Sequence, residues 1–191
     1  MTLAEKKIIL GSASPRRKEI LEGMGLEFEV DTENSFKEEY GPDTPHEQIP
    51  VLMSRGKSHG FHRPLENGEI LITSDTMVLC RGQVLGKPKD REDAVRMLRL
   101  LSGHVHRVIT AVTLRDCNRE VTFSDTSYVH FKDLSDSEID YYTDTFRPYD
   151  KAGAYAIQEW IGYVGITKID GSYYTIMGLP AHRVYEELLK F

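Results

Sequence analysis

The chain has 191 residues, a length typical of one domain, and 40% of them are hydrophobic, which is enough for a buried core. Its net charge of -6 argues against a general nucleic-acid-binding protein, because such proteins present a basic face to phosphates. The two cysteines lack the spacing of a disulfide framework or a zinc module. Without an apolar run of membrane-spanning length or a signal-peptide pattern, the protein is expected in the cytoplasm.

The first predicted elements are a strand at 7–10, a tight turn and a helix that begins at Pro15. The turn and the helix start carry Ser12, Ser14, Arg16 and Arg17. A helix N-terminus attracts anions, and arginine binds phosphate bidentately, so this stretch predicts a polyphosphate site. The alternative is an ordinary helix, capped by Ser14, with solvated arginines.

The hydrophobic pattern of the remaining chain predicts alternating strands and helices, followed by paired strands. Further strands are predicted at 28–31, 69–73, 77–80, 83–85, 104–115, 120–131, 163–169 and 173–176. Further helices are predicted from about 46 to 59, from 90 or 91 to 101, from 135 to 146, and from 178 onward. This order is typical of an α/β protein with a mixed, partly antiparallel central sheet.

Asp75 is the leading candidate for a catalytic or metal-binding carboxylate. It follows the predicted strand 69–73, and the carboxyl ends of strands are where α/β sheets place ligands. An aspartate there could hold Mg²⁺ against phosphate oxygens or accept a proton from water. The alternative is an Asx-turn or a helix-cap role for the segment 74–76.

Two other stretches could contact a nucleotide. The segment 82–88 is close to a Walker A loop, but its glycine spacing is short by one residue and Pro88 replaces the magnesium-binding Ser or Thr. Lys87 remains a candidate phosphate contact. In 150–158, small residues permit close approach to a ligand, and Gln158 could bind a base edge. On the local pattern, a helix N-terminus with packing alanines is favoured for that segment.

Taken in order, these motifs resemble those of the Maf family of nucleoside triphosphate pyrophosphatases. The matching stretches are 12–17, 74–78, 85–88, 101–103 with 110–112, 150–155 with 157–158, and 177–180. They cover almost the whole chain, and together they are highly specific. The resemblance implies one Maf-like domain over residues 1–191, with a fold related to the inosine triphosphate pyrophosphatases and two lobes that enclose a deep cleft.

The resemblance also implies a reaction, namely metal-dependent cleavage between the α and β phosphates that releases a nucleoside monophosphate and pyrophosphate. The expected cofactor is Mg²⁺ or Mn²⁺, and Asp75 matches the catalytic carboxylate of the family. The substrate-selecting positions are matched by Arg16, Thr76 and Gln158, and the polar or phosphate-contacting positions by Arg17, Lys57 and Lys87. The segment 150–158 is similar to the dTTP/UTP branch and not to the 7-methyl-GTP branch. A glutamine also suits the uracil or thymine edge.

One position departs from the family pattern. The family usually has a glutamate after the second strand, where this chain has Asn34 with Glu33 beside it. An asparagine cannot supply the negative charge that a divalent ion prefers. Either Glu33 joins Asp75 in holding the metal, or metal binding is weaker in this chain.

Two rival functions are compatible with these motifs. One is a nucleotide-binding regulator of septum formation with little catalysis, which the departure at Asn34 keeps open. The other is a purine-directed housecleaning pyrophosphatase. In each case the expected partner is a nucleoside triphosphate, with neither nucleic acid nor a membrane involved. Members of the family are often dimers, so a homodimer is one assembly open to this chain.

Overall fold

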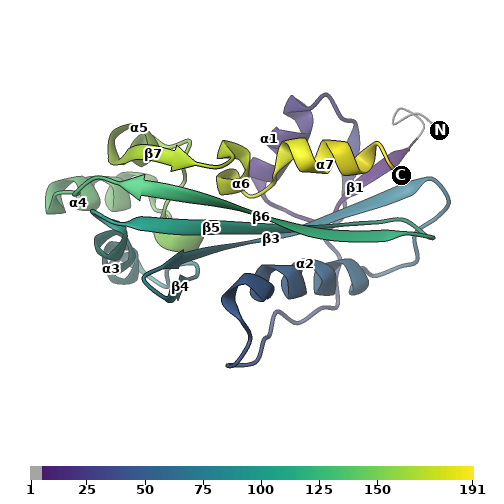
Figure 1. Ribbon diagram of the computed structural model, residues 1–191, viewed down its shortest axis with the longest axis horizontal. Helices are drawn as coiled ribbons and strands as arrows, with labels where there is room; N and C mark the ends of the chain where they lie inside the picture. Colours follow the sequence, from purple (N-terminus) through teal and green to yellow (C-terminus); the bar gives the residue numbers. More distant parts are fainter. Residues whose placement is uncertain (1–5) are drawn as a thin grey trace. The chain divides into compact units, whose positions relative to one another are not determined.

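A computed structural model describes residues 6–191 and shows a mixed sheet with helices packed on it (Figure 1). The strands are β1 (Lys7–Leu10), β2 (Phe28–Val30), β3 (Glu69–Cys80), β4 (Gln83–Leu85), β5 (Val105–Arg115), β6 (Glu120–Phe131) and β7 (Ile166–Asp170). The α-helices are α1 (Pro15–Gly23), α2 (Ile49–His59), α3 (Arg91–Leu101), α4 (Asp136–Phe146), α5 (Trp160–Gly165), α6 (Tyr173–Met177) and α7 (Ala181–Leu188). The 3₁₀ helices are η2 (His46–Gln48) and η3 (Ala152–Ala154).

The described residues form a seven-stranded sheet in the order β2-β1-β3-β5-β6-β7, and β4 pairs with β3 outside this path. Strand β1 is parallel to both of its neighbours, β2 and β3. The pairs β3–β4 and β6–β7 are antiparallel. The predicted mixed α/β class is therefore confirmed. Within residues 6–191, no helix is both long enough and apolar enough to cross a membrane.

The chain divides into two compact units, each assembled from several segments. Unit 1 comprises residues 1–75, 110–125 and 178–191, and unit 2 comprises residues 76–109 and 126–177. Strands β3, β5 and β6 each have residues in both units. The deep cleft and the single Maf-like domain over residues 1–191 stay predictions.

In unit 1, the alternation of side chains along β3 directs successive residues to opposite faces of the sheet. The Thr73 hydroxyl donates to the Ser54 carbonyl of α2 at 2.8 Å, and the Ser54 hydroxyl lies 2.8 Å from that of Thr113 in β5. The next residue, Ser74, instead donates its hydroxyl to the carbonyl of Gly178, shortly before α7, at 3.0 Å. Helix α2 therefore lies on the face of β3 opposite to the Gly178 turn.

In unit 2, local sequence signals explain the helix starts and the hairpin. The Asp90 carboxylate accepts from the backbone N–H of Asp93 at the start of α3. Ser135 and Glu138 form a reciprocal capping box at the start of α4. The β3–β4 hairpin turns through Arg81 and Gly82, which both have positive φ, as a type I′ turn requires. Helix α3 packs against α4 and η3.

Three predicted boundaries or element types are wrong. Strand β3 does not end at Thr73 but continues to Cys80, so Asp75 lies inside a strand. The predicted strand 163–169 is divided between α5 and β7, and the predicted strand 173–176 is the helix α6. Short apolar and aromatic runs fit a strand or a buried helix equally well by periodicity, and tertiary packing decides between them.

Candidate active site

The predicted polyphosphate site lies in unit 1, where β1 ends and α1 begins. The Gly11 N–H donates to the Ile72 carbonyl at 2.8 Å, which extends the β1–β3 pairing by one residue. A Cβ on Gly11 would lie 2.9 Å from a methyl carbon of Thr73, so only glycine fits without a shift. Helix α1 begins at Pro15 with Ser14 at the N-cap, as predicted. The Ser14 side chain, however, makes no capping hydrogen bond to the first turn.

Arg17 is a half-buried cation that the fold holds in a defined position. Its Nε donates to the Gly178 carbonyl at 2.9 Å, and its Nη1 donates to the Ser12 hydroxyl, also at 2.9 Å. Desolvation of the guanidinium lowers the pKa of Arg17 to about 10, although the negative charge of Asp75 opposes this change. The side chain therefore stays protonated at neutral pH, and it could bind phosphate without first being ordered.

Asp75 lies inside β3, three residues beyond the end of the β1–β3 pairing at Leu10 and Ile72. Asp75 therefore lies just beyond the carboxyl end of β1, whereas β3 itself continues past it to Cys80. By alternation Asp75 faces the α2 side, where its Oδ1 is 2.7 Å from Nζ of Lys57. About one fifth of each side chain remains exposed, so the pair is accessible from solvent.

A second carboxylate, which the sequence did not single out, also contacts Lys57. Oε1 of Glu38 lies 2.9 Å from the same Nζ, and the Glu38 side chain is 63% exposed. Its charge, like that of Asp75, acts on Arg17 and favours the protonated guanidinium. Glu38 lies in a polar stretch with Glu39 beside it, and no sequence pattern distinguishes one from the other.

Asn34, the position that departs from the family pattern, has a structural role. Its Nδ2 donates to the Lys57 carbonyl at 2.5 Å, and its Oδ1 accepts from the backbone N–H of Phe36 at 2.8 Å. Asn34 also forms an antiparallel bridge with Phe61. A carboxylate at this position could not donate to the Lys57 carbonyl. The amide therefore anchors the segment after β2 to the last turn of α2.

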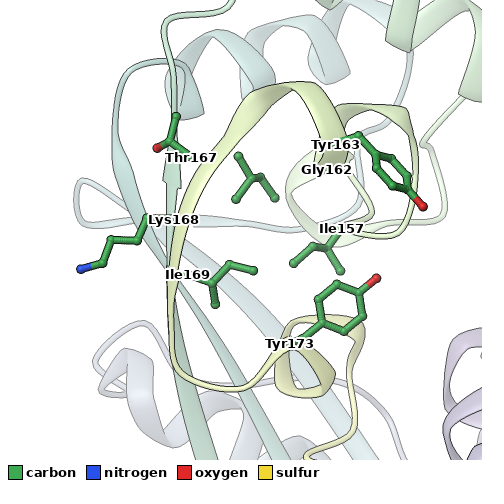
Figure 2. Close-up of a pocket in the computed structure, with 8 residues that line it drawn as sticks. Ile157, Gly162, Tyr163, Thr167, Lys168, Ile169 and Tyr173 are labelled. Atoms are coloured by element: carbon green, nitrogen blue, oxygen red, sulfur yellow. The ribbon is translucent and has the colours of Figure 1, made fainter.

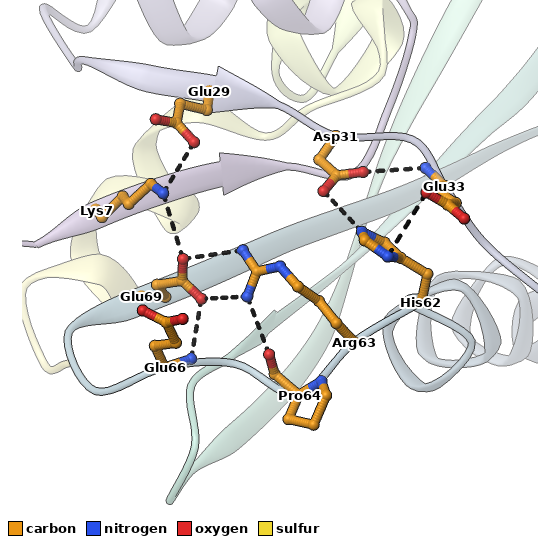
Figure 3. A network of polar contacts seen from close by, with 9 residues as sticks. All are labelled: Lys7, Glu29, Asp31, Glu33, His62, Arg63, Pro64, Glu66 and Glu69. Carbon is orange, nitrogen blue, oxygen red and sulfur yellow. Dashed lines mark hydrogen bonds and ion pairs between the residues drawn. The ribbon is translucent and has the colours of Figure 1, made fainter.

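The neighbouring Glu33 belongs to a separate polar network (Figure 3). Its carboxylate lies 3.6 Å from Nδ1 of His62, whose other ring nitrogen is 2.9 Å from the carboxylate of Asp31. The Glu33 side chain is 76% exposed. Over residues 6–191, no group of three or more His, Cys, Asp and Glu side chains is placed to hold a metal ion. A shared role of Glu33 and Asp75 in metal binding stays a prediction.

Unit 2 carries the other predicted site residues, Thr76, Lys87 and Gln158. The Gly153 N–H donates to the carbonyl of Gly86 at 3.1 Å, so the segment 150–158 lies against the residue before Lys87. Gly153 has a φ of +73°, and a Cβ there would lie 3.0 Å from Val78. The favoured interpretation of this segment is right that alanines pack in the interior, since Ala154 and Ala156 are buried, but the helix is only the three-residue turn η3.

Around Gln158 the chain is held by buried polar contacts. The Tyr142 hydroxyl donates to the carboxylate of Glu159 and accepts from the Ala156 N–H at 3.1 Å. The Lys151 ammonium lies 3.3 Å from the same carboxylate. Among residues 6–191, the buried Oε1 of Gln158 has no hydrogen-bond partner. Leaving such an acceptor unpaired costs about 1–3 kcal/mol, and a ligand that donates to it would recover that cost.

Unit 2 also has a pocket of about 390 Å³ (Figure 2). It is lined by Ile157, Gly162, Tyr163, Ile166, Thr167, Lys168, Ile169 and Tyr173. None of these is a predicted site residue. The one charged side chain of the lining, Lys168, pairs with Asp170 at 2.8 Å. With this single cation already paired, the pocket lacks the convergent charged groups that a polyphosphate would need.

The protein is thus of the mixed α/β class. In unit 1 the partly exposed Asp75 pairs with Lys57, and its negative charge also acts on Arg17. A family model described as Maf-like protein matches residues 7–191. A dTTP/UTP pyrophosphatase of Porphyromonas gingivalis (strain ATCC BAA-308 / W83) is 47% identical over 191 residues, which are 99% of this chain and 96% of that protein. A dTTP/UTP pyrophosphatase of Bacteroides thetaiotaomicron is 48% identical over 188 residues, 98% and 97% of the two chains.

The chain therefore belongs to the Maf family, as the motifs predicted. Among solved structures, a HAM1 protein from Coxiella burnetii overlaps with a TM-score of 0.40 and 12% identity, over 66% of this chain and 73% of that one.

Proposed function

We infer that the chain is a nucleoside triphosphate pyrophosphatase that hydrolyses dTTP and UTP to the monophosphate and pyrophosphate. Relatives that are 47% and 48% identical over nearly their whole length carry the name of that activity. The structural observation that carries the inference is the partly exposed Asp75–Lys57 pair at 2.7 Å, in the same unit as Arg17, which Gly178 and Ser12 orient. Such a hydrolysis needs cations that bind the polyphosphate, and a carboxylate beside them that activates water.

We propose that the triphosphate binds at the start of α1, where backbone N–H groups and the helix dipole favour anions. Arg17 is already oriented by Gly178 and Ser12, so little side-chain entropy is lost when it binds phosphate. Lys57 supplies a second positive charge. Arg16, Lys87 and Ser14 are proposed as further contacts because of the resemblance.

Asp75 is proposed to position the attacking water and accept its proton. Its Oδ1 is oriented by Lys57, and the remaining exposure of the carboxylate leaves room for a water molecule. Proton transfer to a positioned carboxylate contributes about 10²- to 10⁴-fold in rate. The regulatory alternative is not favoured, because the relatives are named as enzymes.

The proposed cofactor is Mg²⁺ or Mn²⁺. The donor set fits, because Mg²⁺ is commonly held by one or two carboxylates with the remaining ligands from phosphates and water. Asp75 would be its main protein ligand, with Glu33 as the predicted second. When bound, the ion would offset negative charge that develops on phosphate oxygens.

Gln158 is proposed to select the base. Uracil and thymine carry an N3–H donor between two carbonyl acceptors, which matches the acceptor and donor of a glutamine amide. Cytosine has no N3–H, and its donor is the exocyclic N4 amino group, so it offers no donor at the N3 position to the buried Oε1 of Gln158. Thr76 and Arg16 are proposed as further selecting residues because of the resemblance.

The test is turnover of the purified protein on dTTP, UTP, CTP, GTP, ITP and 7-methyl-GTP, with Mg²⁺ and with Mn²⁺. Pyrophosphate and monophosphate are both quantified. The proposal expects equal amounts of both products, with dTTP and UTP fastest. Faster turnover of a purine nucleotide contradicts the branch assignment. Binding of dTTP without products under either metal contradicts the enzymatic function and favours the regulator.

We also propose a cytoplasmic location and a homodimer. Cys80 is buried, Cys117 is exposed, and neither forms a disulfide, which fits a reducing compartment. The dimer rests on the resemblance alone. Light scattering on the purified protein gives the molar mass, and a value near 21.8 kDa would contradict the dimer.

A further inference from the structure

Gln158 lies in a tight turn of unit 2, and one buried hydroxyl contacts both ends of that turn. The Glu159 N–H donates to the Ala156 carbonyl at 3.1 Å, which places Gln158 at the third position of the turn 156–159. The hydroxyl of Tyr142, a fully buried residue of α4, accepts from the Ala156 N–H at 3.1 Å and donates to the Glu159 carboxylate. Tyr142 therefore holds together the first and last residues of the turn that carries Gln158.

The Glu159 carboxylate is in turn held by a cation. The Lys151 ammonium lies 3.3 Å from it, and only 10% of the Lys151 side chain is exposed. Lys151 also pairs with Asp150 at 2.7 Å. A hydrogen bond to an ionised acceptor is stronger than one to a neutral acceptor, so the charge on Glu159 strengthens its contact with Tyr142. These residues touch neither the proposed phosphate contacts nor Asp75, so the proposed function does not account for them.

The chain that enters the turn is anchored separately. The Tyr155 hydroxyl lies 2.7 Å from Nε2 of His106 in β5, and the Tyr155 ring packs edge-on against Phe131, with 5.1 Å between the ring centres. Desolvation lowers the pKa of His106 to about 3, so the ring stays neutral at pH 7. Loss of the Tyr142 hydroxyl would therefore loosen the turn without releasing the segment before it.

The orientation of the Gln158 amide decides which base it can bind. Rotation of a glutamine amide by 180° exchanges its acceptor and its donor. Uracil and thymine donate from N3, whereas cytosine accepts at N3 and donates from N4. A freely rotating Gln158 would thus bind cytosine as well as uracil. Selection requires that Oε1 keep one position, and the turn that sets this position depends on Tyr142.

We propose that Tyr142 and Glu159 are positioning residues for base selection, which hold the turn 156–159 so that the buried Oε1 of Gln158 faces the N3 position of a uracil or thymine base. Lys151 holds the Glu159 carboxylate in place. The role of Gln158 as the residue that contacts the base rests on the proposed function.

The experiment compares kcat and KM for UTP and CTP in the wild type, Tyr142→Phe and Tyr141→Phe. The phenylalanine keeps the ring that stacks on Phe146, with 5.0 Å between the ring centres, and removes only the hydroxyl. The ratio of kcat/KM for UTP over CTP should fall about three- to ten-fold in Tyr142→Phe, through a higher KM for UTP with kcat unchanged. Tyr141→Phe is the matched control, because it removes a hydroxyl from the neighbouring exposed residue, and its ratio should not change.

A second pair of variants tests the same contact from the other side. Glu159→Gln keeps an acceptor for the Tyr142 hydroxyl, whereas Glu159→Ala removes it. The ratio should fall in Glu159→Ala as it does in Tyr142→Phe, and by clearly less in Glu159→Gln. The double variant Tyr142→Phe with Glu159→Ala should lose less than the product of the two single effects, because both act on one contact. If Tyr142→Phe does not fold, the two Glu159 variants decide the question.

An unchanged preference for UTP in folded Tyr142→Phe overturns the proposal, and so does an equal fall of kcat with both nucleotides, which is the result of general structural damage. Calorimetric binding of the α,β-imido analogues of UTP and CTP repeats the comparison without turnover. A wild type that prefers the UTP analogue but hydrolyses no nucleotide would refute the proposed function and still test Tyr142. A wild type that binds both analogues equally would overturn the positioning role.

Discussion

Glu69, the first residue of β3, forms an ion pair with Arg63, and the geometry of this pair lets its contribution to stability be worked out (Figure 3). Two nitrogens of the Arg63 guanidinium contact the two oxygens of Glu69 at 2.7 and 2.9 Å. The backbone N–H of Glu66 donates to the same carboxylate at 2.9 Å, and Glu69 is 4% exposed. The hydrogen bonds from Arg63 are the main reason that the pKa of Glu69 falls from 4.5 to about 2.

We predict that Glu69→Gln lowers the free energy of unfolding by about 2–3 kcal/mol at pH 7. This is less than the stabilisation that the whole pKa shift of Glu69 implies, because Arg63 is partly exposed and water screens the pair. The folded-state pKa lies below the unfolded one. The stabilisation is therefore fully present above pH 4.5 and is lost as the pH falls toward 2.

Urea unfolding followed by circular dichroism, at pH values from 7 down to 3.5, measures both the difference and its pH dependence. The gap between the wild type and Glu69→Gln should narrow below pH 4.5. Glu66→Gln is the control, because only its backbone contacts Glu69, and it should stay within about 0.5 kcal/mol of the wild type. A gap that does not change with pH would refute the linkage argument.

Three further predictions concern the site and its support. Asp75→Asn should fold normally and release pyrophosphate from dTTP at least about a hundred-fold more slowly, because the amide cannot accept the proton from water. An active variant would contradict the role of Asp75. Gln158→Leu should lower the preference for UTP over CTP by roughly ten-fold, since no buried acceptor is left for N3–H, and competition assays measure that ratio. Gly56→Ala should lower stability by about 1–3 kcal/mol in thermal unfolding, because its Cβ would overlap the Phe36 ring, and an unchanged melting temperature would contradict this close packing of Phe36 on α2.

The local signals in the sequence determined a large part of the fold. Capping residues such as Asp90 and Ser135 act within one helical turn, and the Arg81–Gly82 turn needs only its own two residues. These effects depend on neighbours three or four residues away, so the pattern of residue types is enough to predict them. The family motifs likewise identified Asp75 as a candidate without any coordinates.

Only the tertiary structure decided how the candidate site is built. Arg17 is oriented by Gly178, which is 161 residues away in the chain, and no local pattern encodes that contact. The sequence placed Asp75 after a strand, whereas pairing across the sheet carries β3 past it. The departure at Asn34 suggested a weakened metal site, but packing on α2 gives the amide a structural role and brings Glu38 to Lys57. Such contacts arise from packing between distant segments, where burial and geometry outweigh local propensity.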